Sequence, residues 1–333
     1  MKAAILMHYG KAPYAIQVDD VLEPKLGPRD ALVRVRAAGV NPVDTMIARK
    51  EVQLLAGYRT PLIMGNELAG EVEAIGADVT RVHVGQRIMC RMPVDRIGAF
   101  AQYAAIDENA LAPIPDGYSF EEAATLSLTA LTAAQALDLL HGSRPGNTVF
   151  VSGGTGSLGA TTIPLAAARG LRVIASGSAQ HEQRVLALGA ERFIDYRTQD
   201  YTHVLRGIDF VIDGLGGDEV KRQLGIMREG GTLVSLRGGP NGEFARREGY
   251  GPLKRALFTV AGMRFDRAAA ARKQRYRFVY VHSDGEQLAQ AVTVLAQRSV
   301  KAHVGDVLPL EQAAEALARV DAGGSAGKIV LVP

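Results

Sequence analysis

Three glycines near the middle of the chain have a spacing that can bind a dinucleotide. Gly154, Gly156 and Gly159 lie in the stretch VFVSGGTGSLGA (149–160), directly after the strand-like run NTVFVS. Gly153 and Gly154 can form a tight turn, Gly156 lets the backbone approach a pyrophosphate, and Gly159 lets a helix pack closely on the strand. An ordinary glycine-rich turn is the alternative. We assign the whole loop to the cofactor site: Gly153, Gly154, Thr155, Gly156, Ser157, Leu158 and Gly159.

The end of the next expected strand indicates which dinucleotide binds. Enzymes that use NAD usually carry an acidic residue there for the ribose 2′-hydroxyl. Here the run RVIAS ends at Ser176, and no acidic residue follows before Glu182. Donors for a 2′-phosphate are available in the same stretch: Ser176, Ser178, His181 and Arg184. We therefore expect NADP(H), with a solvated helix face as the alternative role of His181 and Arg184.

The composition is that of a soluble globular protein with two domains of ordinary size. The 333 residues are 47% hydrophobic and 22% charged, and the net charge of +3 comes from scattered cations. This distribution argues against nucleic-acid binding. The single cysteine, Cys90, excludes an internal disulfide and a multi-cysteine zinc site. We find neither a secretory signal nor a long apolar run, so we expect a cytoplasmic protein that does not bind a membrane.

The elements that would hold the glycine loop alternate between strand and helix. The first third of the chain has short strands separated by turns, which is typical of a compact, barrel-like β domain. A helix with Ser119 as its N-cap opens the next region. Six runs then predict the strands of a doubly wound parallel sheet: TVFVSG, RVIASG, RFIDY, DFVIDGLG, GTLVSLRG and YRFVYV. We expect helices between these strands, at about 157–169, 181–189 and 220–228.

The end of the chain indicates how the domains are connected. Beyond two more helices, expected at about 285–297 and 310–320, comes the apolar run GKIVLVP. This run needs a sheet to join, and the parallel sheet already has six strands. We infer an α/β protein in which a Rossmann-type sheet is inserted in a β-rich catalytic domain. The expected boundaries are 1–121 for the first part of the catalytic domain, 122–282 for the nucleotide domain, and 283–333 for the return segment.

Seven segments in order along the chain carry a family resemblance: AAGVNPVDTMI, PLIMGNELAGEVEAIG, VGQRI, AFAQYAAI, AATLSLTALTAAQAL, the glycine loop and GSAGKIVLV. With them the chain resembles the zinc-independent quinone oxidoreductase (zeta-crystallin-like) branch of the medium-chain dehydrogenase/reductase superfamily. The resemblance implies that the β-rich domain is GroES-like. In zinc-dependent members, the positions of Asn41 and Asn66 hold a cysteine and a histidine. Amides are poor zinc ligands by comparison, so we expect no metal.

The resemblance also implies roles for single residues. Asn41 and Asp44 stand where the branch lines its active-site cleft, with Asn41 in reach of the cofactor or substrate. Thr132 matches a threonine near the nicotinamide, and Tyr196 matches a tyrosine that lies against the 2′-phosphate. We also assign to the cofactor site three residues after the fourth and fifth expected strands: Gly214, Leu215 and Leu236.

The chemistry that fits these residues is reduction of a small molecule, either a quinone or an α,β-unsaturated carbonyl. A conjugated acceptor takes a hydride and spreads the charge onto its own oxygen, so the protein needs to orient it and to hydrogen-bond that oxygen. Candidate donors are Asn41 and a tyrosine such as Tyr58 or Tyr103, for which a packed aromatic role is the alternative. Asp44 is a catalytic candidate that orients Asn41 or caps the following helix.

Two other functions stay open. An enoyl-thioester or acryloyl-type reductase would bind a phosphate-bearing carrier with the basic stretch 239–276, although a solvated helix face also explains those cations. A non-catalytic NADPH-binding protein is the second alternative, because His181 and Met46 stand where relatives often carry a lysine and a tyrosine. The resemblance further implies a homodimer, which we expect to pair through the edge strand YRFVYV.

Overall fold

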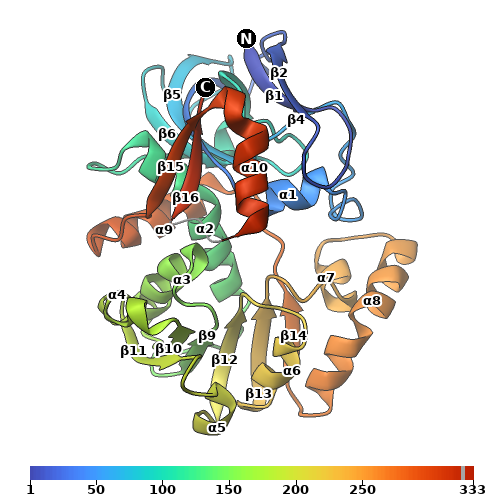
Figure 1. Ribbon diagram of the computed structural model, residues 1–333, viewed down its shortest axis with the longest axis vertical. Helices are drawn as coiled ribbons and strands as arrows, with labels where there is room; N and C mark the ends of the chain where they lie inside the picture. Colours follow the sequence, from blue (N-terminus) through green and yellow to red (C-terminus); the bar gives the residue numbers. More distant parts are fainter. Residues whose placement is uncertain (324–326) are drawn as a thin grey trace. The chain divides into compact units, whose positions relative to one another are not determined.

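The computed structural model describes residues 1–323 and 327–333, and the chain divides into two compact units. Unit 1 holds both ends of the chain: Met1–Leu131, His282–Ala296 and Lys301–Pro333. Unit 2 holds the middle: Thr132–Val281 and Gln297–Val300. The blue and the red ends of the chain accordingly belong to the same unit (Figure 1). The first three residues of the expected GSAGKIVLV segment lie outside the described residues.

Unit 2 is built around a parallel sheet that, in the described residues, has six strands in the order β11-β10-β9-β12-β13-β14. Its strands are β9 (Thr148–Val151), β10 (Arg172–Gly177), β11 (Ala190–Asp195), β12 (Ile208–Asp213), β13 (Met227–Ser235) and β14 (Arg275–Phe278). Counted from β9, this is the 3-2-1-4-5-6 order of a doubly wound fold. Both faces of a parallel sheet are covered, so its strands are apolar along their whole length. The apolar runs of the sequence fit such strands. The predicted fold class is confirmed.

Helices connect these strands: α3 (Ser157–Ala168), α4 (Glu182–Ala187), α5 (Tyr201–Val204), α6 (Glu219–Leu224), α7 (Gly242–Arg247) and α8 (Pro252–Ala270). The helix expected at 220–228 is too long, because α6 ends at Leu224 and Met227 already begins β13. Met227 pairs with Ile208 of β12, and this pairing with a neighbouring strand overrides the local helical pattern. The run YRFVYV is likewise only in part a strand, since β14 ends at Phe278.

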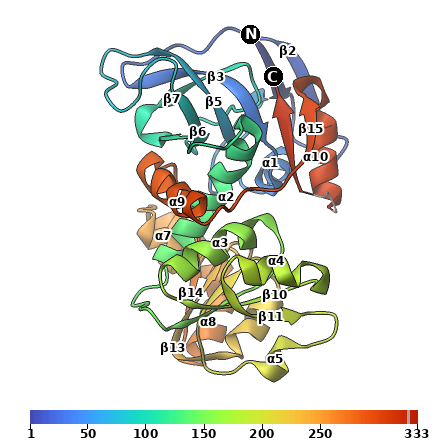
Figure 2. The same ribbon diagram turned by 90° about the vertical axis from the view of Figure 1, so that its left-hand side faces the viewer.

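Unit 1 consists mainly of strands. A small sheet has the order β2-β1-β4, and in a larger one β15-β16-β3-β5-β6-β8 follow one another, with β7 also paired to β3. The bounds are β1 (Lys2–Leu6), β2 (Ile16–Asp20), β3 (Asp30–Gly39), β4 (Leu62–Ile63), β5 (Glu67–Ile75), β6 (Arg87–Arg91), β7 (Tyr103–Asp107), β8 (Leu111–Pro113), β15 (Val304–Pro309) and β16 (Lys328–Val332). β3 pairs with both β5 and β7, and the three strands lie close together in Figure 2. β16 pairs with β3, so the last strand joins the sheet that the first residues begin, as the apolar run GKIVLVP predicts.

The longer helices near unit 1 are α1 (Pro42–Ala48), α2 (Phe120–Asp138), α9 (Gly285–Gln297) and α10 (Ala313–Ala322); single turns lie at η1 (Glu108–Ala110), η2 (Ala179–His181, in unit 2) and η3 (Leu310–Gln312). A capping box starts α2: Ser119 N–H donates to Glu122 Oε2 (2.9 Å), and Glu122 N–H donates to Ser119 Oγ (3.1 Å). This confirms Ser119 as the N-cap. Among the described residues, no helix is both long enough and apolar enough to cross a membrane.

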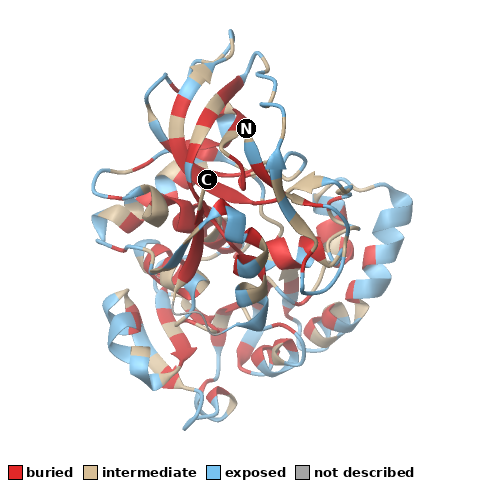
Figure 3. Ribbon diagram, turned by 45° about the horizontal axis from the view of Figure 1, so that its top comes forward, coloured by how far each residue is buried: buried red, intermediate tan, exposed pale blue. Residues whose placement is uncertain are grey.

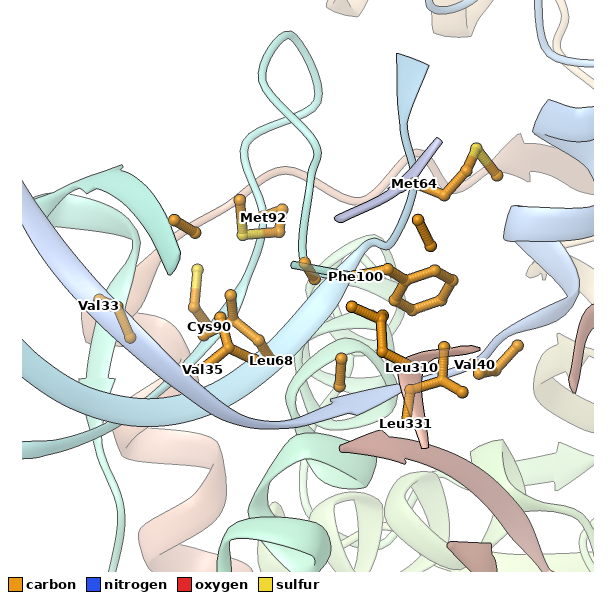
Figure 4. Close-up of a cluster of buried hydrophobic side chains, with 14 of the residues drawn as sticks. Val33, Val35, Val40, Met64, Leu68, Cys90, Met92, Phe100, Leu310 and Leu331 are labelled. Atoms are coloured by element: carbon orange, nitrogen blue, oxygen red, sulfur yellow. The ribbon is translucent and has the colours of Figure 1, made fainter. Parts of the chain in front are cut away.

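A hydrophobic core fixes the strands that carry the polar site of unit 1. Buried segments are concentrated on the strands (Figure 3). Val35 of β3, Leu68 of β5 and Phe100 belong to one buried cluster (Figure 4). Cys90 lies in the same cluster, where burial raises the pKa of its thiol to about 12. A thiol that stays protonated is a packing group and not a nucleophile.

Candidate functional site

Five buried polar side chains of unit 1 form a group that we call the Asn41 cluster: Asn41, Asp44, Asn66, Glu67 and Lys328. Asn41 follows β3 and is the N-cap of α1, and Asp44 lies in the first turn of that helix. Asn66 directly precedes β5, which begins at Glu67, and Lys328 begins β16. None of the five is more than 8% exposed. Because buried polar groups need partners, their hydrogen bonds define what the cluster can do.

Glu67 holds the Asn41 amide in place. Its Oε1 accepts a hydrogen bond from Asn41 Nδ2 (2.8 Å) and forms an ion pair with Lys328 Nζ. Its Oε2 accepts the Leu128 N–H of α2 (2.6 Å), and Lys328 Nζ also donates to the Thr125 carbonyl (2.9 Å). The sequence analysis did not single out Lys328 as a site residue. A lysine that opens an otherwise apolar strand is the signal that could have found Lys328.

Asp44 links the two asparagines. Its Oδ2 accepts the Asn41 backbone N–H (2.8 Å), and its Oδ1 accepts Asn66 Nδ2 (2.7 Å). The carboxyl is completely buried, and this loss of solvation raises its pKa to about 7 although the two hydrogen bonds favour the charged form. Asp44 is therefore a helix-capping residue that can hold a proton near neutral pH.

The raised pKa of Asp44 predicts a pH-dependent stability. The carboxyl of an unfolded chain titrates near about pH 3.9, so between about pH 4 and 7 the folded state keeps a proton that the unfolded state releases. The contribution of Asp44 is fully present below this window and is lost as the pH rises through 7. Asp44→Asn removes the titration. The unfolding free energy of the wild type, minus that of the variant, should fall by about 4 kcal/mol between pH 4 and 7.5.

Urea unfolding at a series of pH values measures this difference. The slope of the difference is the readout, since the substitution also alters the hydrogen bonds of Asn41 and Asn66 at every pH. Parallel stability curves for the two proteins across the window would refute the prediction.

The two candidate tyrosines already have partners. The Tyr58 hydroxyl donates to the Val94 carbonyl (2.7 Å), and burial raises its pKa to about 12. The Tyr103 ring lies under the Arg34 guanidinium, 5.4 Å from its centre. These contacts fit the packed aromatic alternative for both side chains, and Tyr58 could serve a substrate only by leaving the Val94 carbonyl.

The Asn41 cluster does not fit a zinc ion. Both asparagines direct Nδ2 at carboxylates, and the ammonium of Lys328 stands beside Glu67. Zinc prefers thiolate, imidazole and carboxylate ligands, and it would have to displace these donors. Within the part of the chain that the structure describes, no three or more His, Cys, Asp and Glu side chains form a group that could hold a metal. We assign no step to a metal.

The glycine loop of unit 2 fits a pyrophosphate. Gly153 has a φ of +69°, and the Gly154 N–H donates to the Ser176 carbonyl (2.7 Å), which fixes the turn against β10. A Cβ on Gly159 would lie 2.4 Å from the Gly154 carbonyl oxygen. Gly156 is the N-cap of α3, and it has no side chain that could accept hydrogen bonds from the first N–H groups of the helix. These N–H groups can therefore bind an anion.

The residues expected at the 2′-phosphate lie beside this loop. Arg184 Nη2 of α4 donates to the Thr155 carbonyl (2.6 Å), and His181 Nε2 lies 3.0 Å from Gln180 Nε2. Ser178 precedes the η2 turn. The Tyr196 N–H donates to the Gly177 carbonyl at the end of β10 (3.3 Å).

Arg197 is a further cation at this place that the sequence analysis missed. Its guanidinium lies 5.8 Å from the centre of the Tyr196 ring, and 59% of Tyr196 is exposed. The signal was an arginine directly after the tyrosine that matches a phosphate contact. Arg197 adds positive charge next to the residues expected to bind the 2′-phosphate.

A buried carboxylate organises the remaining cofactor residues. Asp213, at the end of β12, accepts the Leu215 N–H (3.0 Å) and the Ser235 hydroxyl (2.6 Å) at the end of β13. The Gly214 N–H donates to Ser152 Oγ (3.1 Å), and the Leu236 N–H donates to the Asp213 carbonyl (3.0 Å). The sequence analysis missed Asp213, although an acid that ends an apolar strand was visible. Thr132 lies on α2 and is the first residue of unit 2.

Comparisons with known proteins agree with both units. The family model described as "Alcohol dehydrogenase GroES-like domain" matches residues 27–116, and the one described as "Zinc-binding dehydrogenase" matches residues 188–331. The chain is 26% identical to the "Quinone-oxidoreductase homolog, chloroplastic" of Spinacia oleracea, over 99% of this chain and 100% of that protein. It is 28% identical to the "Quinone oxidoreductase" of Mus musculus, over 70% of this chain and 72% of that protein.

A solved structure, that of the quinone oxidoreductase from Coxiella burnetii, matches with a TM-score of 0.84 and 25% identity, covering 100% of this chain and 99% of that one. The chain belongs to the medium-chain dehydrogenase/reductase superfamily. Within this superfamily it is a zinc-independent, quinone oxidoreductase-like protein. One matching family model is named for zinc binding, but the amide donors of the Asn41 cluster are not zinc ligands.

Membership of this superfamily fixes the general chemistry. The protein is an oxidoreductase that uses a nicotinamide cofactor and acts on a small molecule. The glycine loop, with its close approach of Gly159 to Gly154 and its uncapped helix start, fits the pyrophosphate of that cofactor. The Asn41 cluster supplies two amides, two carboxyl groups and an ammonium.

Proposed function

We propose that the protein is an NADPH-dependent reductase that transfers a hydride to a quinone or an α,β-unsaturated carbonyl. The observation that carries the proposal is the Asn41 cluster, in which buried amides stand where zinc-dependent relatives hold their metal ligands. Without a Lewis acid, oxidation of a simple alcohol has no electrophile. A conjugated acceptor needs only orientation and a hydrogen bond to its oxygen.

Each member of the cluster then has a task. The nicotinamide supplies the hydride when it is bound. Asn41 is held by Glu67 in one orientation, which suits a group that orients a reacting molecule. Asp44 holds a proton below about pH 7 and fixes both Asn41 and Asn66. Lys328 pairs with Glu67 Oε1, the same oxygen that accepts the Asn41 amide.

A steady-state screen tests this proposal. The acceptors are 1,2-quinones, 1,4-quinones, 2-alkenals and enoyl thioesters, each with NADPH and with NADH. Turnover of a quinone or an alkenal with NADPH is the expected result. A protein that changes NADPH fluorescence but oxidises it with none of the acceptors would instead be the non-catalytic NADPH-binding protein.

The preference for NADPH is expected to depend on Arg184. Removing a charged donor to a phosphate costs about 1.5–3 kcal/mol, so Arg184→Ala should lower kcat/KM for NADPH about 10- to 100-fold. The value for NADH should stay nearly unchanged, because NADH lacks the 2′-phosphate. Arg206→Ala is the matched control. Arg206 precedes β12 and so lies at the amino ends of the parallel strands, whereas Arg184 follows β10 at their carboxyl ends. An equal loss with both cofactors would mean that Arg184 only supports the loop through Thr155.

The basic stretch 239–276 supports the solvated-face alternative. Lys254 lies over the Tyr250 ring (4.8 Å), Arg264 over the Phe265 ring (4.4 Å), and Lys273 pairs with Glu229 (3.1 Å). Lys254 and Arg264 lie on α8 and Lys273 follows it, and each of these three cations has its own neighbour. We therefore do not adopt a phosphate-bearing carrier as the substrate.

The homodimer stays a prediction, and the edge strand adds a condition to it. The Val279 N–H donates to the Ser235 carbonyl of β13 (3.1 Å). In a parallel strand the backbone groups of alternate residues point to opposite sides, so those of Tyr276 and Phe278 point away from β13. Their carbonyls accept hydrogen bonds from Asn241 Nδ2 (3.5 Å) and Arg247 Nη2 (2.7 Å). A dimer that continues the sheet through β14 has to displace both donors.

A further inference from the structure

Asp213 is a buried carboxylate whose partners among the described residues are all neutral. It ends β12, and its side chain is 0% exposed. Its Oδ1 accepts the Leu215 N–H and Gln223 Nε2 (3.0 Å each), and its Oδ2 accepts the Ser235 hydroxyl (2.6 Å). The Gly216 N–H donates to both oxygens (3.0 and 3.2 Å). All four partners donate, which suits an ionised carboxylate.

These hydrogen bonds leave the charge of Asp213 without a counter-ion. A buried carboxylate is usually paired with a cation, because an isolated charge in a medium of low polarity is unfavourable. Glu67, which is buried to the same degree, has Lys328 as its partner. Asp213 forms no ion pair within the part of the chain that the structure describes. A net negative charge therefore remains behind the loop that follows β12, and it would stabilise a cation bound in front of that loop.

The order of the strands puts this charge on the nicotinamide side of the cofactor site. The glycine loop follows β9, which has β10 on one side and β12 on the other (Figure 1). The residues expected at the 2′-phosphate follow β10, so the adenosine half of a dinucleotide lies on that side. The nicotinamide half then lies toward the carboxyl ends of β12 and β13, the strands that end at Asp213 and Ser235.

The nicotinamide ring is the part of the cofactor whose charge changes in the reaction. Transfer of a hydride removes one hydrogen and two electrons from the ring, so a neutral dihydropyridine becomes a pyridinium cation. The acceptor gains the hydride and then takes a proton from water or from a protein group. A fixed negative charge stabilises the cation relative to the neutral ring, and water screens a buried charge only weakly.

We propose that Asp213 stabilises the oxidised, cationic nicotinamide and thereby makes bound NADPH a stronger hydride donor. This inference rests on the proposed function, because it concerns the direction from NADPH to the acceptor. It adds to that function a carboxylate that acts through its charge, from a position behind residues 214–217.

The dissociation constants of the two redox forms test the inference without turnover. In Asp213→Asn, the ratio of the constant for NADP⁺ to that for NADPH should rise about 10-fold, which raises the potential of the bound two-electron couple by about 30 mV. The amide can still accept the Leu215 N–H and donate to Ser235 Oγ, so the loops keep most of their hydrogen bonds. Fluorescence titration measures NADPH, and competition against it measures NADP⁺. NADH and NAD⁺ replace this pair if they bind more tightly.

Two control variants separate the charge from the structure of the loops. Ser235→Ala removes a donor to Asp213 and the acceptor of the Gly238 N–H (2.7 Å), but it removes no charge. It should weaken NADP⁺ and NADPH by the same factor. Asp218→Asn removes an exposed carboxylate at the N-cap of α6. Water screens that charge, so the ratio should stay unchanged.

A pair of ligands tests the wild type alone and does not depend on the folding of Asp213→Asn. NAD⁺ and benzamide adenine dinucleotide have rings of the same shape, and only the ring of NAD⁺ carries a charge. The wild type should bind NAD⁺ about 10-fold more tightly than the neutral analogue. Calorimetric titration measures both constants.

Three outcomes decide the matter. An equal loss of affinity for NADP⁺ and NADPH in Asp213→Asn would overturn the inference, because it indicates a carboxylate that only holds the loops. Equal binding of NAD⁺ and its neutral analogue by the wild type would overturn it as well. A wild type that reduces none of the acceptors would refute the proposed function, and the ratio of the two constants would still decide the role of Asp213.

Discussion

Lys328→Met is expected to lower the free energy of unfolding by about 3–5 kcal/mol, the largest stability effect that we predict for a single side chain. The Lys328 side chain is 8% exposed and that of Glu67 is 0% exposed, so neither charge of this ion pair is solvated. Methionine fills a similar volume but removes the cation. Glu67 then keeps its hydrogen bonds from Asn41 and Leu128 and lacks a compensating charge.

Urea unfolding followed by circular dichroism measures the effect. Lys2→Met is the matched control, because Lys2 pairs with Glu311 at the surface, where both side chains are about half exposed, and only a small change is expected. The double variant Lys328→Met/Glu67→Gln should recover much of the loss, since no uncompensated charge remains buried. A loss no larger than that of Lys2→Met would show that the pair is not a determinant of stability.

Activity should fall together with stability in Lys328→Met. Asn41 Nδ2 and Lys328 Nζ share Glu67 Oε1, so without the ammonium this oxygen loses one of its two partners and holds Asn41 less firmly. The amide can then rotate, and kcat should fall more than the affinity for the cofactor does, because the cofactor loop belongs to unit 2. This prediction separates the positioning of Asn41 from cofactor binding.

Local sequence patterns predicted the cofactor unit well. The glycine loop follows a strand and starts a helix, and each of these signals lies within a dozen residues. The capping box at Ser119 is equally local, since Glu122 lies one helical turn further on. The parallel sheet could be predicted because its strands are buried on both faces and therefore read as apolar runs.

Contacts between distant parts of the chain were not predictable in this way. Lys328 meets Glu67 only because β16 returns to β3, and the sequence shows a single lysine in an apolar run. Asp213 was missed for the same reason, since its partner Ser235 lies on the next strand. The helix expected beyond Leu224 failed because pairing of Met227 with Ile208 decides the conformation there. The partners of these residues can be identified only when the register of the strands is known.

The Asn41 cluster depends both on residue types that the sequence shows and on contacts between distant residues that only the structure shows. Its asparagines could be read from the sequence as poor zinc ligands, whereas their orientation follows from Asp44 and Glu67 in the structure. A metal site would be held together by one divalent ion. Here the same space is held together by an ion pair and a chain of hydrogen bonds, so removal of any one partner leaves another buried group unsatisfied.

The second large effect is expected for Gly159→Ala, at the start of α3. The added Cβ would lie 2.4 Å from the carbonyl oxygen of Gly154 and 2.5 Å from its Cα. Both atoms belong to the backbone of the glycine loop, so the helix has to move away from the turn. Overpacking of this kind costs about 1–3 kcal/mol. A displaced loop that loses this much binding free energy binds NADPH about 5- to 150-fold more weakly. Fluorescence titration with NADPH measures the dissociation constant.

Two other glycines separate the packing of the loop from the approach of the cofactor. A Cβ on Gly251 meets no atom within 4 Å, so Gly251→Ala should leave both stability and NADPH affinity unchanged. A Cβ on Gly156 makes only an ordinary contact, 3.5 Å from the Gly153 carbonyl oxygen, so Gly156→Ala should fold normally. If the pyrophosphate lies against this backbone, Gly156→Ala nevertheless loses affinity, because the added methyl occupies the space that the cofactor needs. Unchanged affinity in both Gly156→Ala and Gly159→Ala would place the cofactor elsewhere in unit 2.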